Sequence, residues 1–144
     1  MAIIKNVNAD AIIAVYPFTP QPSITQAIIS VSEVPVFVGV GGGMTNGDRS
    51  VRLAEFSEHQ GASGVVVNAP ISNETIAKMK AVVDIPVVTT IVSGDMDIAG
   101  RLAAGADILN VSGASRTPEI VTKIRAEFPT VPIIATGGPT DEDI

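Results

Sequence analysis

The chain has 144 residues, of which 46% are hydrophobic, and this is enough for one domain with a sizeable core. Its formal net charge of −6 argues against nucleic acid or an anionic membrane as the main partner, and the lack of cysteine excludes disulfides and thiolate metal sites. No apolar run approaches the roughly 18 residues of a membrane span, so we expect a cytoplasmic protein that binds neither nucleic acid nor membranes.

Six runs rich in β-branched apolar residues recur along the chain. Continuous rather than alternating apolarity is typical of parallel strands that are covered on both faces. The expected strands, in chain order, are Ala11–Tyr16, Val36–Val40, Val65–Val67, Val87–Val92, Ile108–Val111 and Ile133–Ala135. After the last strand, Pro139 and the residues that follow it resemble the first turn of a further helix.

Segments with helical spacing of apolar residues separate these strands. The spacing is clear over residues 24–31, 76–83 and 120–128, and it is weaker over residues 48–60 and 95–104. Helix starts are expected at Asp48, Asp95 and Thr117-Pro118-Glu119, and helix ends at Gly61 and Gly105. The chain is therefore a repeated βα unit.

The loops that enter the strands alternate between two types. "EVPVF", "DIPVV" and "TVPII" carry a proline, whereas "NADAII", "GASGVV" and "GADILN" carry a small residue followed by alanine. The larger repeat is thus βαβα, present three times, and four such repeats would complete a (β/α)8 TIM barrel. We expect an α/β barrel with about six βα units, and an open doubly wound parallel sheet is the alternative.

The stretch "IPVVTTIVSGDMDIAGRLAAGADILNVSGAS" followed by "VPIIATGGPTDEDI" resembles the phosphate-binding TIM barrels, especially the ketodeoxyphosphogluconate aldolase group. This resemblance implies that the six strands correspond to strands 2–7 of a barrel. Residues 1–144 would then be a single barrel domain that lacks its first strand and is truncated at its C-terminus. Such an incomplete barrel is expected to form homo-oligomers through Ala11–Tyr16 and Ile133–Ala135, because unpaired strand edges recruit other chains.

The aldolases of that group carry a Schiff-base lysine on the sixth strand, where this chain has "ILNVSG" with Asn110. The lysines of the chain are Lys5, Lys78, Lys80 and Lys123, and the last three fall in expected helices. The sequence therefore argues against a Schiff-base aldolase.

Glycine-rich strand exits are the first candidates for a binding site. After a strand, Thr136-Gly137-Gly138 would offer backbone N–H groups and a hydroxyl to phosphate, with a plain tight turn as the alternative. Gly41, Gly42 and Gly43 lie in "GVGGGMTNGDRS", which matches no nucleotide-binding fingerprint but is typical of a loop that covers a substrate. Ser112, Gly113 and Arg116 form a third exit, and Arg116 could bind an anionic substrate or be a solvated residue of the helix start.

Polar residues at other strand exits are the candidates for catalysis. Asn68 and Asn110 end two strands of the same type and could hydrogen-bond a ligand or their own loop backbone. Asp48 and Asp95 are the nearest carboxylates, although both also suit helix starts. Either could hold Mg²⁺, but no metal site or other cofactor is evident from the sequence. His59 ends a helix, at the opposite end of the barrel from the strand exits.

The function expected from these features is a metabolic enzyme that acts on a small anionic substrate, phosphorylated or carboxylated. Lyase, isomerase and hydrolase chemistry all remain open, because such barrels host many reactions. The alternatives are a regulatory barrel that binds a phosphorylated metabolite without turnover, or an inactive fragment.

Overall fold

The computed structural model describes residues 2–6, 8–16 and 18–137. Its six strands form one parallel sheet in which they follow each other in chain order. The strands are β1 (Ile12–Ala14), β2 (Val36–Gly39), β3 (Gly64–Val67), β4 (Val87–Ile91), β5 (Ile108–Val111) and β6 (Ile133–Ala135). All six coincide with the expected strands, although β1 begins after Ala11 and ends two residues before Tyr16.

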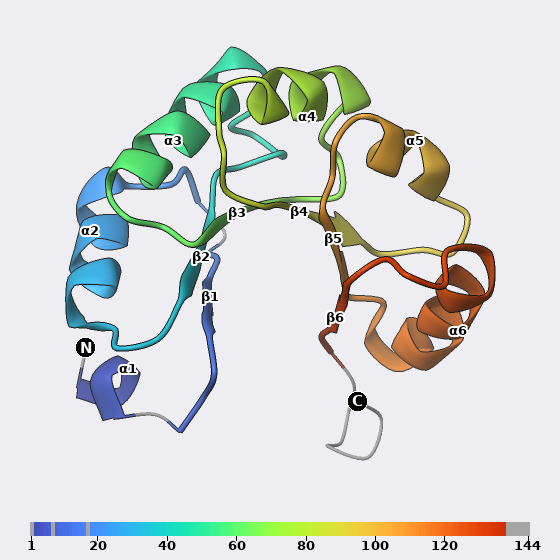
Figure 1. Ribbon diagram of the computed structural model, residues 1–144, viewed down its shortest axis with the longest axis horizontal. Coiled ribbons are helices and arrows are strands. Elements are labelled where there is room, and N and C mark those ends of the chain that lie inside the picture. The colour runs from blue at the N-terminus through green and yellow to red at the C-terminus, as the bar shows by residue number, and fades with distance from the viewer. Residues whose placement is uncertain (1, 7, 17, 138–144) are drawn as a thin grey trace.

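The sheet is strongly curved, and its helices lie on the convex side (Figure 1). Consecutive strand order with helices on a single face is the arrangement of a (β/α) barrel, whereas a doubly wound sheet reverses its strand order and carries helices on both faces. The fold is therefore part of a TIM barrel, and the alternative of an open doubly wound sheet is wrong.

Five of the described helices each follow a strand, as the apolar spacing predicts, and a further short helix precedes the first strand. They are α1 (Ala2–Asn6), α2 (Pro22–Val31), α3 (Asp48–His59), α4 (Asn73–Lys80), α5 (Ile98–Ala103) and α6 (Thr117–Glu127), with a 3-10 turn η1 (Ala114–Arg116) before α6. The start of the fifth helix differs from expectation, because Asp97 rather than Asp95 caps α5 by accepting a hydrogen bond from the Gly100 N–H at 2.9 Å. The expected helix start at Pro139 lies outside the described residues.

The hydrophobic core lies between the convex side of the sheet and the helices. Because side chains alternate along a strand, every second residue points toward the helices. One core cluster joins β2, β3 and α4 through residues such as Val38, Val67 and Ile76, and a second joins β5 and α6 through Leu109 and Ile120. The remaining strand residues point to the concave side, where no helix of the described part covers them (Figure 1).

Thr89 and Thr90 interrupt the apolar β4 and lie on opposite faces of the sheet. Thr89 alternates with the buried Val87 and Ile91 and is itself fully buried, yet its hydroxyl has no hydrogen-bond partner among the described residues. Thr90 is on the concave face, where it is half-buried.

In the described part of the chain, no helix has both the length and the apolarity needed to cross a membrane.

Candidate functional site

The carboxyl ends of the six parallel strands meet at one rim of the sheet, which we call the mouth. In (β/α) barrels the chemistry is located at this rim, because the strand-exit loops converge there. The sequence places small or polar residues at most of these exits, and the structure brings several of them together on the concave side.

A row of polar side chains crosses the concave side of β3 to β6 at the mouth. We call Asn68, Thr90, Asn110 and Thr136 the polar row. Thr90 and Asn110 are paired in register, and Asn68 follows directly on Val67, whose register partner is Thr89. The Asn110 amide donates to Thr90 Oγ1 at 3.5 Å, and its Oδ1 accepts a hydrogen bond from Thr136 Oγ1 at 3.1 Å.

The two asparagines of the polar row differ in exposure. Asn110 is only 9% exposed and is held by its two threonine neighbours, so its amide is oriented before any ligand arrives. Asn68 is exposed, and its side chain makes no hydrogen bond with any other residue that the structure describes. Asn68 is therefore the member of the row whose amide is available to a ligand.

The exit of β6 uses most of its hydrogen-bonding groups internally. The Thr136 N–H donates to the Val111 carbonyl at 2.8 Å, and Thr117 Oγ1 accepts from the Gly113 N–H at 2.9 Å while donating to the Thr136 carbonyl at 3.2 Å. An added methyl group at Gly137 would lie 3.8 Å from Ser112 Oγ, so these two residues are neighbours. Phosphate binding at Thr136, Gly137 and Gly138 stays a prediction, and Gly138 lies outside the described residues.

A cavity of about 260 Å³ opens between the exits of β1 and β2. It is lined by Val15, Tyr16, Phe18, Thr19, Pro20, Gly39, Gly41, Gly43, Met44, Thr45 and Asn68. The ring centroids of Tyr16 and Phe18 are 4.6 Å apart, and the Tyr16 hydroxyl accepts a hydrogen bond from the Gln21 N–H at 2.8 Å. Asn68 belongs both to this cavity and to the polar row, so the two features form one site.

Glycines 41 and 42 allow the loop after β2 to pack against Asn68. Both have a positive φ, and an added methyl group at Gly42 would lie 2.7 Å from the backbone nitrogen of Asn68. The Asn68 N–H donates to the Gly41 carbonyl at 2.9 Å, and the Gly42 N–H donates to the Thr45 carbonyl at 2.7 Å. This loop therefore shapes the cavity wall with its backbone, and Gly43 lines the cavity itself.

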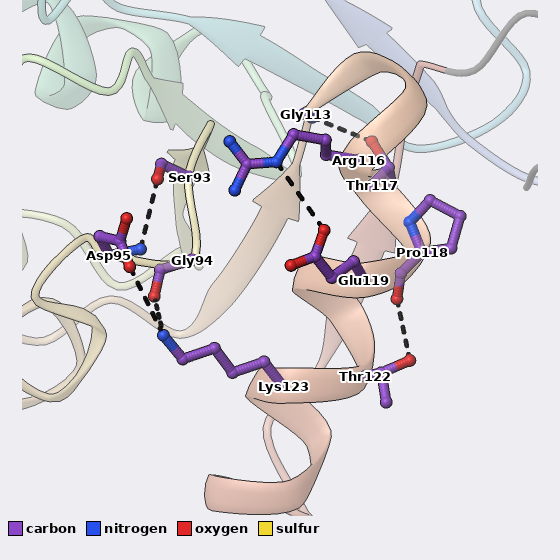
Figure 2. Close-up of polar contacts among 10 residues, drawn as sticks. All are labelled: Ser93, Gly94, Asp95, Gly113, Arg116, Thr117, Pro118, Glu119, Thr122 and Lys123. Carbon is purple, nitrogen blue, oxygen red and sulfur yellow. Dashed lines mark hydrogen bonds and ion pairs between the residues drawn. The ribbon is translucent and has the colours of Figure 1, made fainter.

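Neither predicted carboxylate lines the cavity or takes part in the hydrogen bonds of the polar row. Asp48 lies 3.6 Å from Lys78, and Asp95 lies 3.7 Å from Lys123, as Figure 2 shows for the second pair. Both carboxylates are largely exposed. The hydrogen bond that Lys78 donates to Glu74, followed by the negative charges of Glu74 and Asp48, raises the pKa of Lys78 above its ordinary value. Within residues 2–6, 8–16 and 18–137, no group of three or more acidic or histidine side chains could hold a metal ion.

Arg116 is paired in a similar way at the exit of β5. Its Nε lies 3.8 Å from Glu119 Oε2, one turn further along the chain (Figure 2).

All four lysines are described and all lie on helices, namely α1, α4 and α6, so none projects from a strand into the mouth. His59 is the last residue of α3, at the end of the sheet opposite the mouth.

Arg101 of α5 supports the site in a way that the sequence does not reveal. Its guanidinium donates to the carbonyl of Ala69 at 2.7 Å, to the carbonyl of Ile71, and to Asn73 Oδ1 at 3.0 Å. Burial lowers the pKa of Arg101 below its ordinary value, and the nearby Asp97 opposes this shift. The three contacts fix the loop that follows Asn68.

No protein-family model matches the sequence, and no curated protein matches it either. Solved structures do resemble it. Dihydrodipicolinate synthase from Aquifex aeolicus has a TM-score of 0.71 and 17% identity over 93% of this chain and 54% of its own. A phosphoenolpyruvate phosphomutase from Streptomyces platensis subsp. rosaceus has a TM-score of 0.66 and 18% identity over 79% of this chain and 51% of its own.

A third structure, phosphonopyruvate hydrolase in complex with oxalate and Mg²⁺, has a TM-score of 0.64 and 19% identity over 80% of this chain and 50% of its own. The chain thus spans about half the length of each of these three proteins. At such low identity the likeness establishes the (β/α)-barrel fold, which agrees with the strand order and the curvature of the sheet.

Proposed function

We propose that the chain carries the ligand-binding face of a metabolic enzyme that acts on a small phosphorylated or carboxylated substrate. The observation that carries this proposal is the position of Asn68, which joins the cavity between β1 and β2 to the polar row across β3 to β6. A ligand in the cavity would meet this amide at the rim where (β/α) barrels perform their chemistry.

Two resemblances support a small anionic substrate. The similar structures are named for a synthase, a phosphomutase and a phosphonopyruvate hydrolase, and the last of these holds oxalate. The sequence also resembles the phosphate-binding barrels of the ketodeoxyphosphogluconate aldolase group. Lyase, isomerase and hydrolase chemistry all fit these resemblances. The chain itself argues against a Schiff-base aldolase, since "ILNVSG" with Asn110 stands where the aldolases of that group carry their lysine.

The second candidate function is binding without turnover. Asparagine and threonine make up the whole polar row, and neither titrates in the physiological range, so the row contains no general acid or base. Tyr16 is the titratable side chain among those that line the cavity, as far as the described residues go. This composition favours a barrel that recognises a metabolite and responds to it.

The test is a titration of ¹⁵N-labelled protein with oxalate, phosphonopyruvate, phosphoenolpyruvate and inorganic phosphate, followed by amide chemical shifts. We expect saturable shifts at Asn68, Gly43 and Ser112. In the N68A variant the shifts at Gly43 and Ser112 should need higher probe concentrations to saturate. Saturable shifts confined to residues far from the mouth, or none with any probe, would contradict the proposal. Breakdown or rearrangement of a bound probe then separates an enzyme from a binding protein.

A further inference from the structure

A second groove lies beside the cavity, on the side of α3. Thr19, Pro20, Arg49, Arg52, Leu53 and Phe56 line this groove of about 340 Å³, which we call the arginine groove. Thr19 and Pro20 also line the cavity, so the two hollows share one wall. A small molecule in the cavity is therefore separated from the hollow with the two guanidinium groups by Thr19 and Pro20.

Arg49 and Arg52 differ from most cations of the chain in having no partner among the described residues. Lys78, Lys80, Lys123 and Arg116 form ion pairs, and Arg101 and Arg125 donate to backbone carbonyls. By contrast, neither Arg49 nor Arg52 makes a hydrogen bond or ion pair with any residue that the structure describes. The same holds for Lys5, which lies on α1 and lines neither hollow.

The two arginines are placed to act together. They are three residues apart on α3, and residues at this spacing are neighbours on the helix surface. No carboxylate lines the arginine groove, although the chain as a whole has a net charge of −6. The charged side chains that line the groove are therefore the two arginines alone, and planar guanidinium groups match carboxylate and phosphate oxygens.

Thr19 adds a hydrogen-bond donor at the shared wall. Its Oγ1 accepts a hydrogen bond from Thr45 Oγ1 at 3.0 Å, which leaves its own hydroxyl proton for another acceptor. Thr45 is buried, so this contact also fixes the position of the Thr19 side chain. Because Thr19 lines both hollows, its hydroxyl could donate to an anionic oxygen that lies between the arginine groove and the cavity.

We propose that Arg49, Arg52 and Thr19 bind the anionic group, carboxylate or phosphate, of a small ligand whose uncharged body lies in the cavity. This inference deepens the proposed function and rests on it. The body contacts the apolar wall formed by Tyr16, Phe18 and Met44, so the ligand class is a small acid with an apolar portion rather than a fully polar sugar phosphate.

The chain contains its own reporter for this test. Tyr16 is its single tyrosine and it has no tryptophan, so tyrosine emission comes from the cavity wall alone. The probes are n-butyl phosphate, pentanoate and neutral n-butanol, which share a short apolar chain and differ in charge. The variants are R49Q/R52Q and, as a control with the same change in net charge, K5Q/R125Q.

We expect the anionic probes to bind the wild-type protein about fivefold or more tightly than butanol, with a preference that falls as salt is added. R49Q/R52Q should remove this preference and leave butanol binding unchanged, while K5Q/R125Q keeps it. The comparison of butyl phosphate with pentanoate decides between phosphate and carboxylate.

The experiment distinguishes failure of the anion site from failure of the proposed function. If all three probes change Tyr16 emission equally in every variant, the cavity binds ligands but the arginine groove is not the anion site. If no probe changes the emission, the cavity is not a ligand site, and the proposed function fails together with this inference. An equal loss of anion binding in both double variants would show a general charge effect and would also overturn the assignment.

Discussion

Arg101 Nη2 donates to the carbonyl oxygen of Ala69 at 2.7 Å and so ties α5 to the loop after β3. Ala69 directly follows Asn68, the residue that the cavity and the polar row share. Arg101 is only 9% exposed, and it also contacts Ile71 in the same loop and Asn73, the first residue of α4. One buried guanidinium thus sets the position of the loop that leaves the candidate site.

Removal of this guanidinium should destabilise the fold. We expect R101M to lower the free energy of unfolding by about 2–4 kcal/mol, because it leaves the carbonyls of Ala69 and Ile71 without their donor. R101K should lose less, since an ammonium group can still reach one carbonyl. Urea denaturation measures both, and R125M is the control, because Arg125 binds carbonyls at the exposed end of α6. Equal losses for R101M and R125M would contradict the role assigned to Arg101.

Substitution of Asn110 should mainly lower stability, whereas substitution of Asn68 should mainly weaken ligand binding. N110A should lower the free energy of unfolding by about 1–3 kcal/mol, because it removes the buried side chain that is the hydrogen-bond partner of both Thr90 and Thr136. N68A should change stability by less than about 0.5 kcal/mol, because its exposed side chain has no partner in the described structure, yet it should weaken ligand binding. Thermal unfolding and the amide titration together measure the contrast. Loss of stability in N68A, or unchanged ligand binding, would count against the site.

The strands could be predicted from the sequence because their apolar runs are continuous and their entry loops repeat. Prediction was less accurate at the ends of elements. The apolar pattern continues through Val15 and Tyr16, yet β1 ends at Ala14, because Tyr16 turns into the exit loop and accepts a hydrogen bond from Gln21. The cavity wall was therefore predicted as strand. Helix α1 was not expected, since its five residues are too few to show a helical repeat.

The candidate site could be predicted only where the strand position already determines the place of a residue. The positions of Asn68 and Asn110 at the mouth could be predicted because they end strands, and parallel strands end at one rim. Arg101 carries no such indication, since its partners are backbone carbonyls about 30 positions earlier in the chain. The ion pairs of Asp48 and Asp95 with lysines of neighbouring helices carry no such indication either. Such pairs depend on how adjacent helices pack, which no single sequence pattern shows.

Gly42 should be far more sensitive to substitution than its neighbour Gly43. G42A should lower the free energy of unfolding by about 2 kcal/mol or more, because its φ is positive and the new methyl group would press on the Asn68 backbone. At Gly43 an added methyl group meets nothing within 4 Å, so G43A is the matched control and should be close to neutral. Chemical denaturation of both variants checks this. Similar stabilities would mean that the loop does not depend on the conformation at Gly42.

The concave side of β1 should mediate self-association of the chain. In the described sheet β1 pairs with β2 alone and β6 with β5 alone, so both outer strands have free backbone N–H and carbonyl groups. Ile13 and Val15 add apolar surface beside the first of these edges, with exposed fractions of 37% for Ile13 and 46% for Val15. Open edges next to exposed apolar side chains favour contact with a second copy of the chain.

Light scattering of the 144-residue chain over a range of concentrations measures this association. We expect a mass above that of the monomer, and a return toward the monomer in I13K/V15K, because two ammonium groups at the edge repel the same surface of another copy. V82K/V92K is the control, since it places the same charges on exposed apolar residues that follow α4 and β4 rather than on β1. A wild-type chain that stays monomeric at every concentration would show that the edges are protected. An equal effect of both double variants would mean that net charge, and not the β1 edge, governs the association.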